Sequence, residues 1–96
     1  MPYIRLTINK PRQGEDARVE DLMRKLNELA EASEGCRETF LLKSHDTSGD
    51  IARLAIYDDE AAAEKAANTQ SVLSIRSQLH LLVEPGHSER AFFTEP

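Results

Sequence analysis

Apolar and polar residues alternate in three short stretches of the chain. In residues 3–9 every second side chain is aliphatic, and residues 37–44 and 51–57 also repeat with a period of two. This period is typical of β-strands, in which successive side chains point to opposite faces. Residues 45–50 are a cluster of turn formers between the second and third stretches. The pattern therefore predicts three strands, with the second and third joined as a hairpin.

After the first strand the period changes to that of an amphipathic helix. Apolar residues recur at intervals of three and four, at Val19, Leu22, Met23, Leu26, Leu29 and Ala30. Asp16 is a suitable N-cap, and Gly35 stands where a left-handed residue commonly follows a helix. These features predict one helix over residues 16–33.

A second helical region follows the third strand and is interrupted. Asp58 or Asp59 can cap an alanine-rich segment, because short acidic side chains accept hydrogen bonds at helix N-termini. Residues 68–71 form a polar break, and a helical period resumes over residues 72–82. We therefore expect two helical pieces with a kink between them.

The complete order of elements is β-α-β-β-α-β. Pro85 and Gly86 end the second helical region, and the short segment 87–94 contains a predicted final strand at 90–94. The pattern contains no linker or internal repeat, so residues 1–96 are expected to form one domain. This order matches the ferredoxin-like α+β fold, in which an antiparallel sheet carries both helices on one face.

Such a sheet leaves its other face without helices. We expect the more apolar stripe to contact the helices, namely Ile4, Leu6, Ile8, Phe40, Leu42, Leu54 and Ile56. The residues expected to be buried include Leu22, Leu26, Leu29, Leu54 and Ile56. The uncovered face would then carry Tyr3, Arg5, Thr7, Thr39, Leu41, Ile51, Arg53, Ala55 and Tyr57. That mixed surface is too apolar for water and too polar for a dry core, so it predicts a homodimer with a partly wet cavity between the sheets.

The charge balance narrows the range of partners. The chain carries 12 Lys+Arg against 17 Asp+Glu, a formal net charge of −5, which disfavours nucleic acid because that ligand requires a positive field. No apolar run approaches the about 20 residues that span a bilayer, so no membrane association is expected. Residues 1–12 lack the pattern of a signal peptide and the single cysteine cannot form an internal disulfide, which together predict a cytoplasmic protein.

The histidines and the cysteine predict neither a metal site nor a nucleophile. No two of His45, His80 and His87 have the i, i+4 spacing of helical metal ligands, and solvated or capping roles explain each of them better. Cys36 follows a predicted helix C-terminus, whose negative end raises the pKa of a thiol, so a structural role is favoured. No metal is therefore expected, and no catalytic residue is assigned.

Several motifs together resemble a known family. The first strand continues into Asn-Lys-Pro-Arg-Gln-Gly at residues 9–14, and Glu-Gly-Cys at residues 34–36 leads into the second strand. Tyr-Asp-Asp-Glu-Ala at residues 57–61 opens the second helix, which is broken before the last strand. Over its whole length the chain resembles the antibiotic biosynthesis monooxygenase-like domains of the dimeric α+β barrel superfamily. The resemblance implies two subunits with their sheets face to face, and a cavity between sheet and helices or at the sheet face.

The resemblance also implies a type of chemistry. Some members oxygenate aromatic polyketides or quinols without metal or flavin, because the carbanion of the substrate itself activates oxygen. Another branch degrades haem with an Asn, a Trp and a His. This chain has no tryptophan and places Thr7, not Asn9, where that asparagine would stand, so haem degradation is not expected. The polyketide oxygenases also use a pocket tryptophan, and this chain departs from them in the same way. No cofactor is implied.

Arg5 and Arg53 are the principal binding candidates. Strands one and three are neighbours in the ferredoxin-like order, so the two guanidinium groups could converge on an anionic or enolate oxygen. Asn9 and Tyr57 could add hydrogen bonds, which gives a predicted substrate-binding set of four residues. The alternative is that both arginines are structural, bonded to Glu38, to carbonyl groups or across a dimer interface.

Three functions are compatible with these features. The first is a cofactor-independent monooxygenase acting on an enolisable aromatic or quinol-type small molecule. The second is a dimeric small-molecule-binding or accessory protein without turnover. The third is a structural dimer with an empty cavity. Oxygen consumption by the metal-free protein with a quinol would separate the first from the other two.

Overall fold

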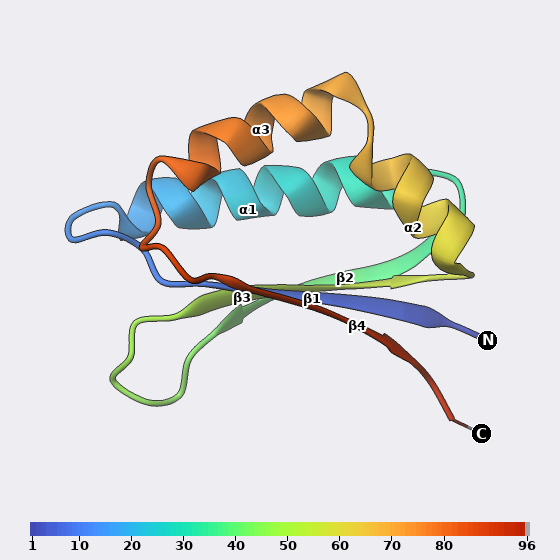
Figure 1. Ribbon diagram of the computed structural model, residues 1–96, viewed down its shortest axis with the longest axis horizontal. Coiled ribbons are helices and arrows are strands. Elements are labelled where there is room, and N and C mark those ends of the chain that lie inside the picture. Colours follow the sequence, from blue (N-terminus) through green and yellow to red (C-terminus); the bar gives the residue numbers. More distant parts are fainter. Residues whose placement is uncertain (96) are drawn as a thin grey trace.

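The computed structural model describes residues 1–95, and in this range four antiparallel strands form one sheet whose one face carries three helices (Figure 1). The elements are β1 (Tyr3–Asn9), α1 (Asp16–Glu31), β2 (Cys36–Lys43), β3 (Ile51–Tyr57), α2 (Glu60–Ala67), α3 (Gln70–His80) and β4 (Ser88–Phe93). The strand order is β2-β3-β1-β4. This arrangement confirms the predicted ferredoxin-like α+β fold. None of the helices described is long and apolar enough to cross a membrane.

The predicted break in the second helical region separates two helices. Asp59 caps α2 by accepting a hydrogen bond from the backbone N–H of Ala62 at 2.9 Å. Thr69 caps α3 in the same way, with Val72 as the donor at 3.3 Å. Because each cap satisfies a free N–H of a first turn, the chain can end one helix and begin the next within a few residues.

The N-terminal end of α1 differs from the prediction. The N-cap is Glu15, without a capping side-chain hydrogen bond, and Asp16 is already the first helical residue. The helix ends two residues earlier than predicted, at Glu31, and Gly35 follows with a φ of +89°. A Cβ at Gly35 would lie 2.6 Å from the Cβ of Ala62, so glycine is required both by the backbone and by the close approach of α2.

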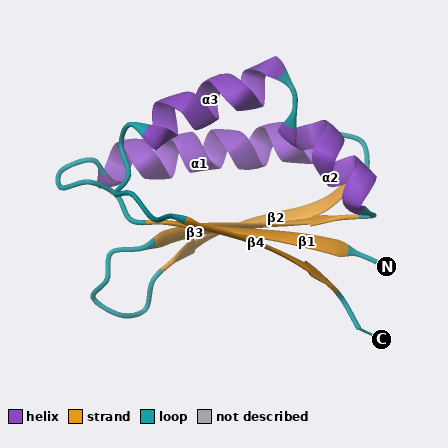
Figure 2. Ribbon diagram, viewed as in Figure 1, coloured by secondary structure: helices purple, strands orange, loops and turns teal. Residues whose placement is uncertain are grey.

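Two groups of buried side chains lie between the sheet and the helices. Around Val19 and Met23 of α1, the first group comprises Leu22, Leu26, Ile51, Val72, Leu79 and Val83. The second group comprises Tyr3, Ala30, Ala55, Tyr57, Ala63 and Ala66. Figure 2 shows the opposite face of the sheet, which no helix covers. The core is therefore built mainly by the helices, with rings and small residues contributed by the sheet.

The predicted assignment of the two sheet faces was wrong. Tyr3, Ile51, Ala55 and Tyr57 are buried against the helices, and the register pairs Tyr3 with Tyr57 and Arg5 with Ala55 on that same face. The aliphatic stripe lies on the uncovered face instead. In this stripe the half-buried residues are Ile4, Leu6, Ile8, Leu54 and Ile56, and the exposed ones are Phe40 and Leu42. Of the helix residues expected to be buried, Leu22 and Leu26 are buried and Leu29 is half-buried.

The volume of the helix side chains explains why the polar stripe, and not the aliphatic stripe, faces the helices. Helix α1 presents Val19, Leu22, Met23 and Leu26 to the sheet, and these long side chains already fill much of the space between the layers. In that group the sheet contributes Ile51, whereas the small Ala55 packs in the second group and polar side chains such as Arg53 line the remaining cavity. A period of two fixes which residues share a face but not which face is covered.

Candidate functional site

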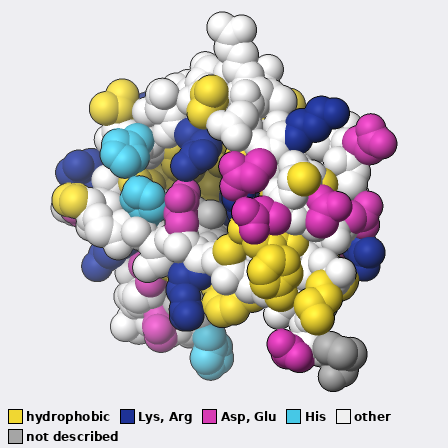
Figure 3. Space-filling view, turned by 45° about the vertical axis from the view of Figure 1, so that its right-hand side comes forward, with side chains coloured by type: hydrophobic (Ala, Val, Ile, Leu, Met, Phe, Trp, Pro, Cys, Tyr) yellow, Lys and Arg dark blue, Asp and Glu magenta, His cyan; other side chains and the backbone are white. Residues whose placement is uncertain are grey.

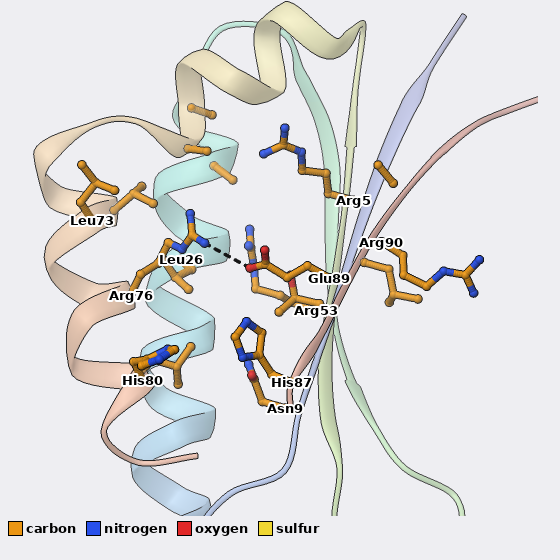
Figure 4. A pocket seen from close by; sticks show the side chains of 18 of the residues that line it. Arg5, Asn9, Leu26, Arg53, Leu73, Arg76, His80, His87, Glu89 and Arg90 are labelled. Carbon is orange, nitrogen blue, oxygen red and sulfur yellow. Dashed lines mark hydrogen bonds and ion pairs between the residues drawn. The ribbon is translucent and has the colours of Figure 1, made fainter. Parts of the chain in front are cut away.

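A cavity of about 800 Å³ lies between the sheet and the helices. Strands β1, β3 and β4 form one side of it, and helices α1, α2 and α3 form the other. The four predicted binding residues, Arg5, Asn9, Arg53 and Tyr57, all line this cavity. Figure 4 shows the first three of them. They do so on the helix-covered side of the sheet, and the prediction that they face the uncovered side was wrong. Their convergence places two guanidinium groups, a phenol and an amide around one space.

Arg53 is held in the cavity by a neutral partner. Its Nε donates a hydrogen bond to Oδ1 of Asn27, a buried residue of α1, at 2.8 Å. Burial lowers the pKa of the guanidinium, and the nearby Tyr57 partly offsets this shift. Within the described residues no carboxylate lies at ion-pair distance from Arg53. A desolvated cation without a counter-ion is costly, so this position attracts an anion.

Arg5 has a different environment. It forms an ion pair with Glu64 of α2, and its guanidinium lies 5.5 Å from the centre of the Tyr3 ring. Burial alone would lower its pKa, but the interactions with Tyr3 and Glu64 outweigh burial and raise the pKa above its ordinary value. Arg5 thus has the structural partner that the alternative interpretation required, although that partner is Glu64 and not Glu38. Of the two arginines, only Arg53 is left without a carboxylate.

Tyr57 and Asn9 complete the polar lining. Tyr57 is 4% exposed, and burial raises the pKa of its phenol against the opposing effect of the Arg53 cation. The phenol therefore remains protonated at neutral pH and can donate a hydrogen bond. Asn9 is 3% exposed and its amide makes a long contact of 3.9 Å with the sulfur of Met23. Such a weak partner leaves the amide available to a ligand.

The mouth of the cavity is formed by residues that sequence reasoning did not assign to the site. Arg76 of α3 and Glu89 of β4 form an ion pair of 3.2 Å that joins helix and strand across the opening. His80 and His87 lie beside this pair, with ring centres 5.6 Å apart. Figure 3 shows histidine side chains next to a hollow with an apolar floor, with basic and acidic side chains at its rim. The sequence contained one indication that these two residues lie close together. His80 and His87 stand on the two sides of the Pro85-Gly86 turn, and a turn brings its flanking segments together.

The Cys36 thiol and the distribution of metal-ligating side chains also limit the chemistry of the site. Burial, and next the nearby Glu31, raise the pKa of the Cys36 thiol, which makes it a poor nucleophile. In residues 1–95 no three or more His, Cys, Asp and Glu side chains are grouped so that they could hold a metal ion. The cavity does present several hydrogen-bond donors and cations, which are suited to stabilising an anionic oxygen.

The sequence matches a known family profile over most of its length. Residues 2–78 match the profile described as antibiotic biosynthesis monooxygenase. The chain belongs to this antibiotic biosynthesis monooxygenase family. A search of curated proteins finds no significant match.

Solved structures from several organisms have the same fold. Rv0793 from Mycobacterium tuberculosis superposes with a TM-score of 0.91 at 19% identity, covering 100% of this chain and 97% of that one. The cofactor-independent oxygenase SnoaB from Streptomyces nogalater gives 0.83 at 16% identity, covering 100% and 96%. PA3566 from Pseudomonas aeruginosa gives 0.85 at 19% identity, covering 99% and 95%. At these sequence identities the structural comparison establishes the fold alone. The chemistry of this chain has to be inferred from its own side chains.

We predict that the phenol of Tyr57 titrates above the ordinary tyrosine value of about 10. The chain has two tyrosines and no tryptophan, so a Tyr3→Phe variant reports Tyr57 alone through the ultraviolet absorbance of its phenolate. Since the folded protein favours the neutral phenol, stability should fall as pH rises above about 10. Adding Arg53→Met should raise the midpoint further, because it removes a cation that favours the phenolate. A midpoint at or below the value of free tyrosine would contradict this description of the site.

Proposed function

We propose that this protein is a cofactor-independent monooxygenase that acts on the anion of an enolisable aromatic or quinol-type small molecule. The observation that carries the proposal is the guanidinium of Arg53, which lines the cavity without a carboxylate partner. Membership of the antibiotic biosynthesis monooxygenase family supports the reaction type. The substrate class is inferred from the cavity.

The cavity has the size and lining that such a substrate requires. A volume of about 800 Å³ falls within the roughly 300–1,000 Å³ of small-molecule sites, and it accommodates fused aromatic rings. Leu26, Val72 and Leu79 provide apolar walls. Arg53 and Tyr57 provide donors on the sheet side, where they would hold the ring oxygen of a bound phenolate or enolate. The arrangement would orient an aromatic anion and shield it from water.

The protein's contribution to the reaction would be to stabilise that anion. An anion held by Arg53 and Tyr57 is electron-rich and can pass one electron to molecular oxygen. Recombination of the resulting radicals forms the carbon–oxygen bond of a peroxide anion, which takes up a proton from water. Loss of water from this hydroperoxide leaves a carbonyl group. With naphthohydroquinone the balance is one substrate and one oxygen molecule giving one hydroxynaphthoquinone and one water. The substrate supplies all four electrons, so no other reductant takes part.

We also infer that the working form is a homodimer joined through the uncovered sheet face. This face carries a continuous apolar stripe in which Leu54 pairs with both Leu6 and Phe40. Phe40, Leu42 and Phe92 are 42%, 40% and 39% exposed, which is unusual for large apolar side chains grouped on one surface. A second copy packed on this stripe would bury more than roughly 1,000 Å² in total. The two cavities would then lie on the outer, helix-covered sides of the paired sheets.

A charge placed in the stripe should separate the subunits. Leu54→Glu puts a carboxylate at the centre of the proposed interface, and we expect light scattering to give the mass of a monomer at micromolar concentration. The matched control is Leu81→Glu, because Leu81 is 76% exposed on the helix side and should leave the dimer intact. A wild-type monomer under the same conditions, or a dimeric Leu54→Glu variant, would show that the subunits do not pair through this face.

Oxygen uptake with naphthohydroquinone tests the proposed activity. The purified protein should accelerate uptake above the protein-free rate, and isotopically heavy oxygen should place one labelled atom in the hydroxynaphthoquinone. Arg53→Met should lower kcat on the order of 10²–10³-fold, the effect of removing one donor to a developing oxyanion. Arg53→Lys should retain more activity because it keeps the positive charge.

The matched control is Arg24→Met, which removes an exposed arginine on α1 that pairs with Glu20 at 2.8 Å. This variant should have the wild-type rate. Binding of naphthohydroquinone without oxygen uptake by the wild type would instead indicate a non-catalytic dimeric binding protein. Equal rates for Arg53→Met and the wild type would remove Arg53 from the mechanism.

A further inference from the structure

His80 and His87 form a pair of rings at the cavity mouth. His80 is the last residue of α3, and His87 immediately precedes β4. Their ring centres are 5.6 Å apart and their planes are inclined by 82°, an edge-to-face contact. Both side chains line the cavity and both are exposed (Figure 4). The two imidazoles thus touch the cavity and the solvent at the same time.

The pair also borders a second space. A smaller hollow of about 250 Å³ lies outside the main cavity, and both histidines line it together with Arg12, Glu84 and the Pro85-Gly86 turn. His80, His87 and Val83 are the residues common to both spaces. The pair therefore stands in the wall between the main cavity and an outer hollow.

The cavity otherwise has no suitable proton acceptor among its described lining residues. Tyrosine and arginine side chains ordinarily hold their protons at neutral pH. Glu89 is the one carboxylate in the lining, and it is paired with Arg76 at 3.2 Å. The guanidinium of Arg76 thus occupies this carboxylate, whereas a neutral imidazole nitrogen is a common proton acceptor in enzymes. The two histidines are the remaining groups able to take a proton from a bound ligand.

We propose that the His80–His87 pair is the proton acceptor of the cavity and the route by which that proton leaves it. The proposal rests on the function proposed above, because an aromatic hydroxyl must lose its proton before Arg53 can hold it as an anion. In this step the O–H bond of the ligand breaks and its electron pair stays on oxygen. An N–H bond forms on an imidazole, and the imidazolium then releases the proton to water in the outer hollow. No electron enters or leaves the protein.

Charged residues of α3, of β4 and of the loops before α1 and β4 surround the histidine pair. Arg76 and Glu89 face it from α3 and β4, and they form an ion pair. Arg12 and Glu84 face it across the outer hollow, with a separation of 4.0 Å between their charged atoms. Each of these two arginines is thus matched by a carboxylate, which leaves the imidazoles as the groups whose charge changes when a proton is accepted.

Binding of naphthol tests the pair without any turnover. Naphthol is neutral in neutral water, and its naphtholate form absorbs at longer wavelength. We expect naphthol bound to the wild type at neutral pH to show the naphtholate band. In the His80→Gln/His87→Gln double variant the naphtholate fraction should be smaller by roughly tenfold or more, the effect of one pKa unit. Both residues are exposed, so circular dichroism should show an unchanged fold.

His45→Gln is the matched control, because His45 lies in the exposed turn between β2 and β3 and lines neither space. It should preserve the naphtholate band. Free imidazole should restore the band to His87→Ala, a rescue that a purely structural role would not produce. A double variant with the wild-type band, or a wild type that binds naphthol only as the neutral molecule or not at all, would overturn the proposal.

Oxygen uptake separates this proposal from the proposed function. In the double variant kcat should fall on the order of 10²–10⁴-fold, the usual contribution of a general base, while KM changes little. If the wild type shows the histidine-dependent naphtholate band but consumes no oxygen, the monooxygenase function fails and the proton acceptor stands. If the double variant consumes oxygen at the wild-type rate, the proton acceptor fails and the monooxygenase function stands.

Discussion

The interaction between Arg53 and Asn27 determines the character of the cavity. A guanidinium placed between a sheet and its helices would ordinarily be neutralised by a carboxylate, but here its Nε donates to an uncharged amide at 2.8 Å. The amide fixes the direction of the side chain and leaves its charge uncompensated. The nearby phenol of Tyr57 is also buried, and the loss of water around it keeps the phenol protonated. The same loss of water makes the positive charge of Arg53 energetically costly. The site is therefore prepared for an anion before any ligand arrives.

Space for this site exists because side chains do not completely fill the gap between the sheet and the helices. Helix α1 contributes long side chains such as Met23 toward one end of the sheet, while alanines such as Ala63 and Ala66 of α2 occupy the other. Residues of both clusters line the cavity, and strand β4 closes its side through the ion pair of Glu89 with Arg76. The aliphatic stripe on the far face of the sheet is then free to contact a second copy. Ligand binding and association thus use opposite faces of the same four strands.

The sequence predicted the element order, the antiparallel sheet, the break between α2 and α3, and the family. It also predicted that Arg5, Asn9, Arg53 and Tyr57 would share one face, because a period of two is unambiguous on that point. It assigned that face wrongly, since both stripes of the sheet contain aliphatic residues and the filling of the interior depends on the helices. The cavity mouth was missed because its residues meet only when the last strand pairs with β1, which brings β4 opposite α3.

The central claim is that Arg53 makes the cavity selective for an anion, and a matched pair of ligands tests it most directly. Naphthoate and naphthamide have the same ring system and nearly the same shape, but only naphthoate is charged. Calorimetry should show naphthoate binding at least about tenfold more tightly than naphthamide, equivalent to roughly 1.4 kcal/mol, with the preference lost in Arg53→Met. Equal affinities in the wild type, or a preference that survives the loss of Arg53, would contradict the account.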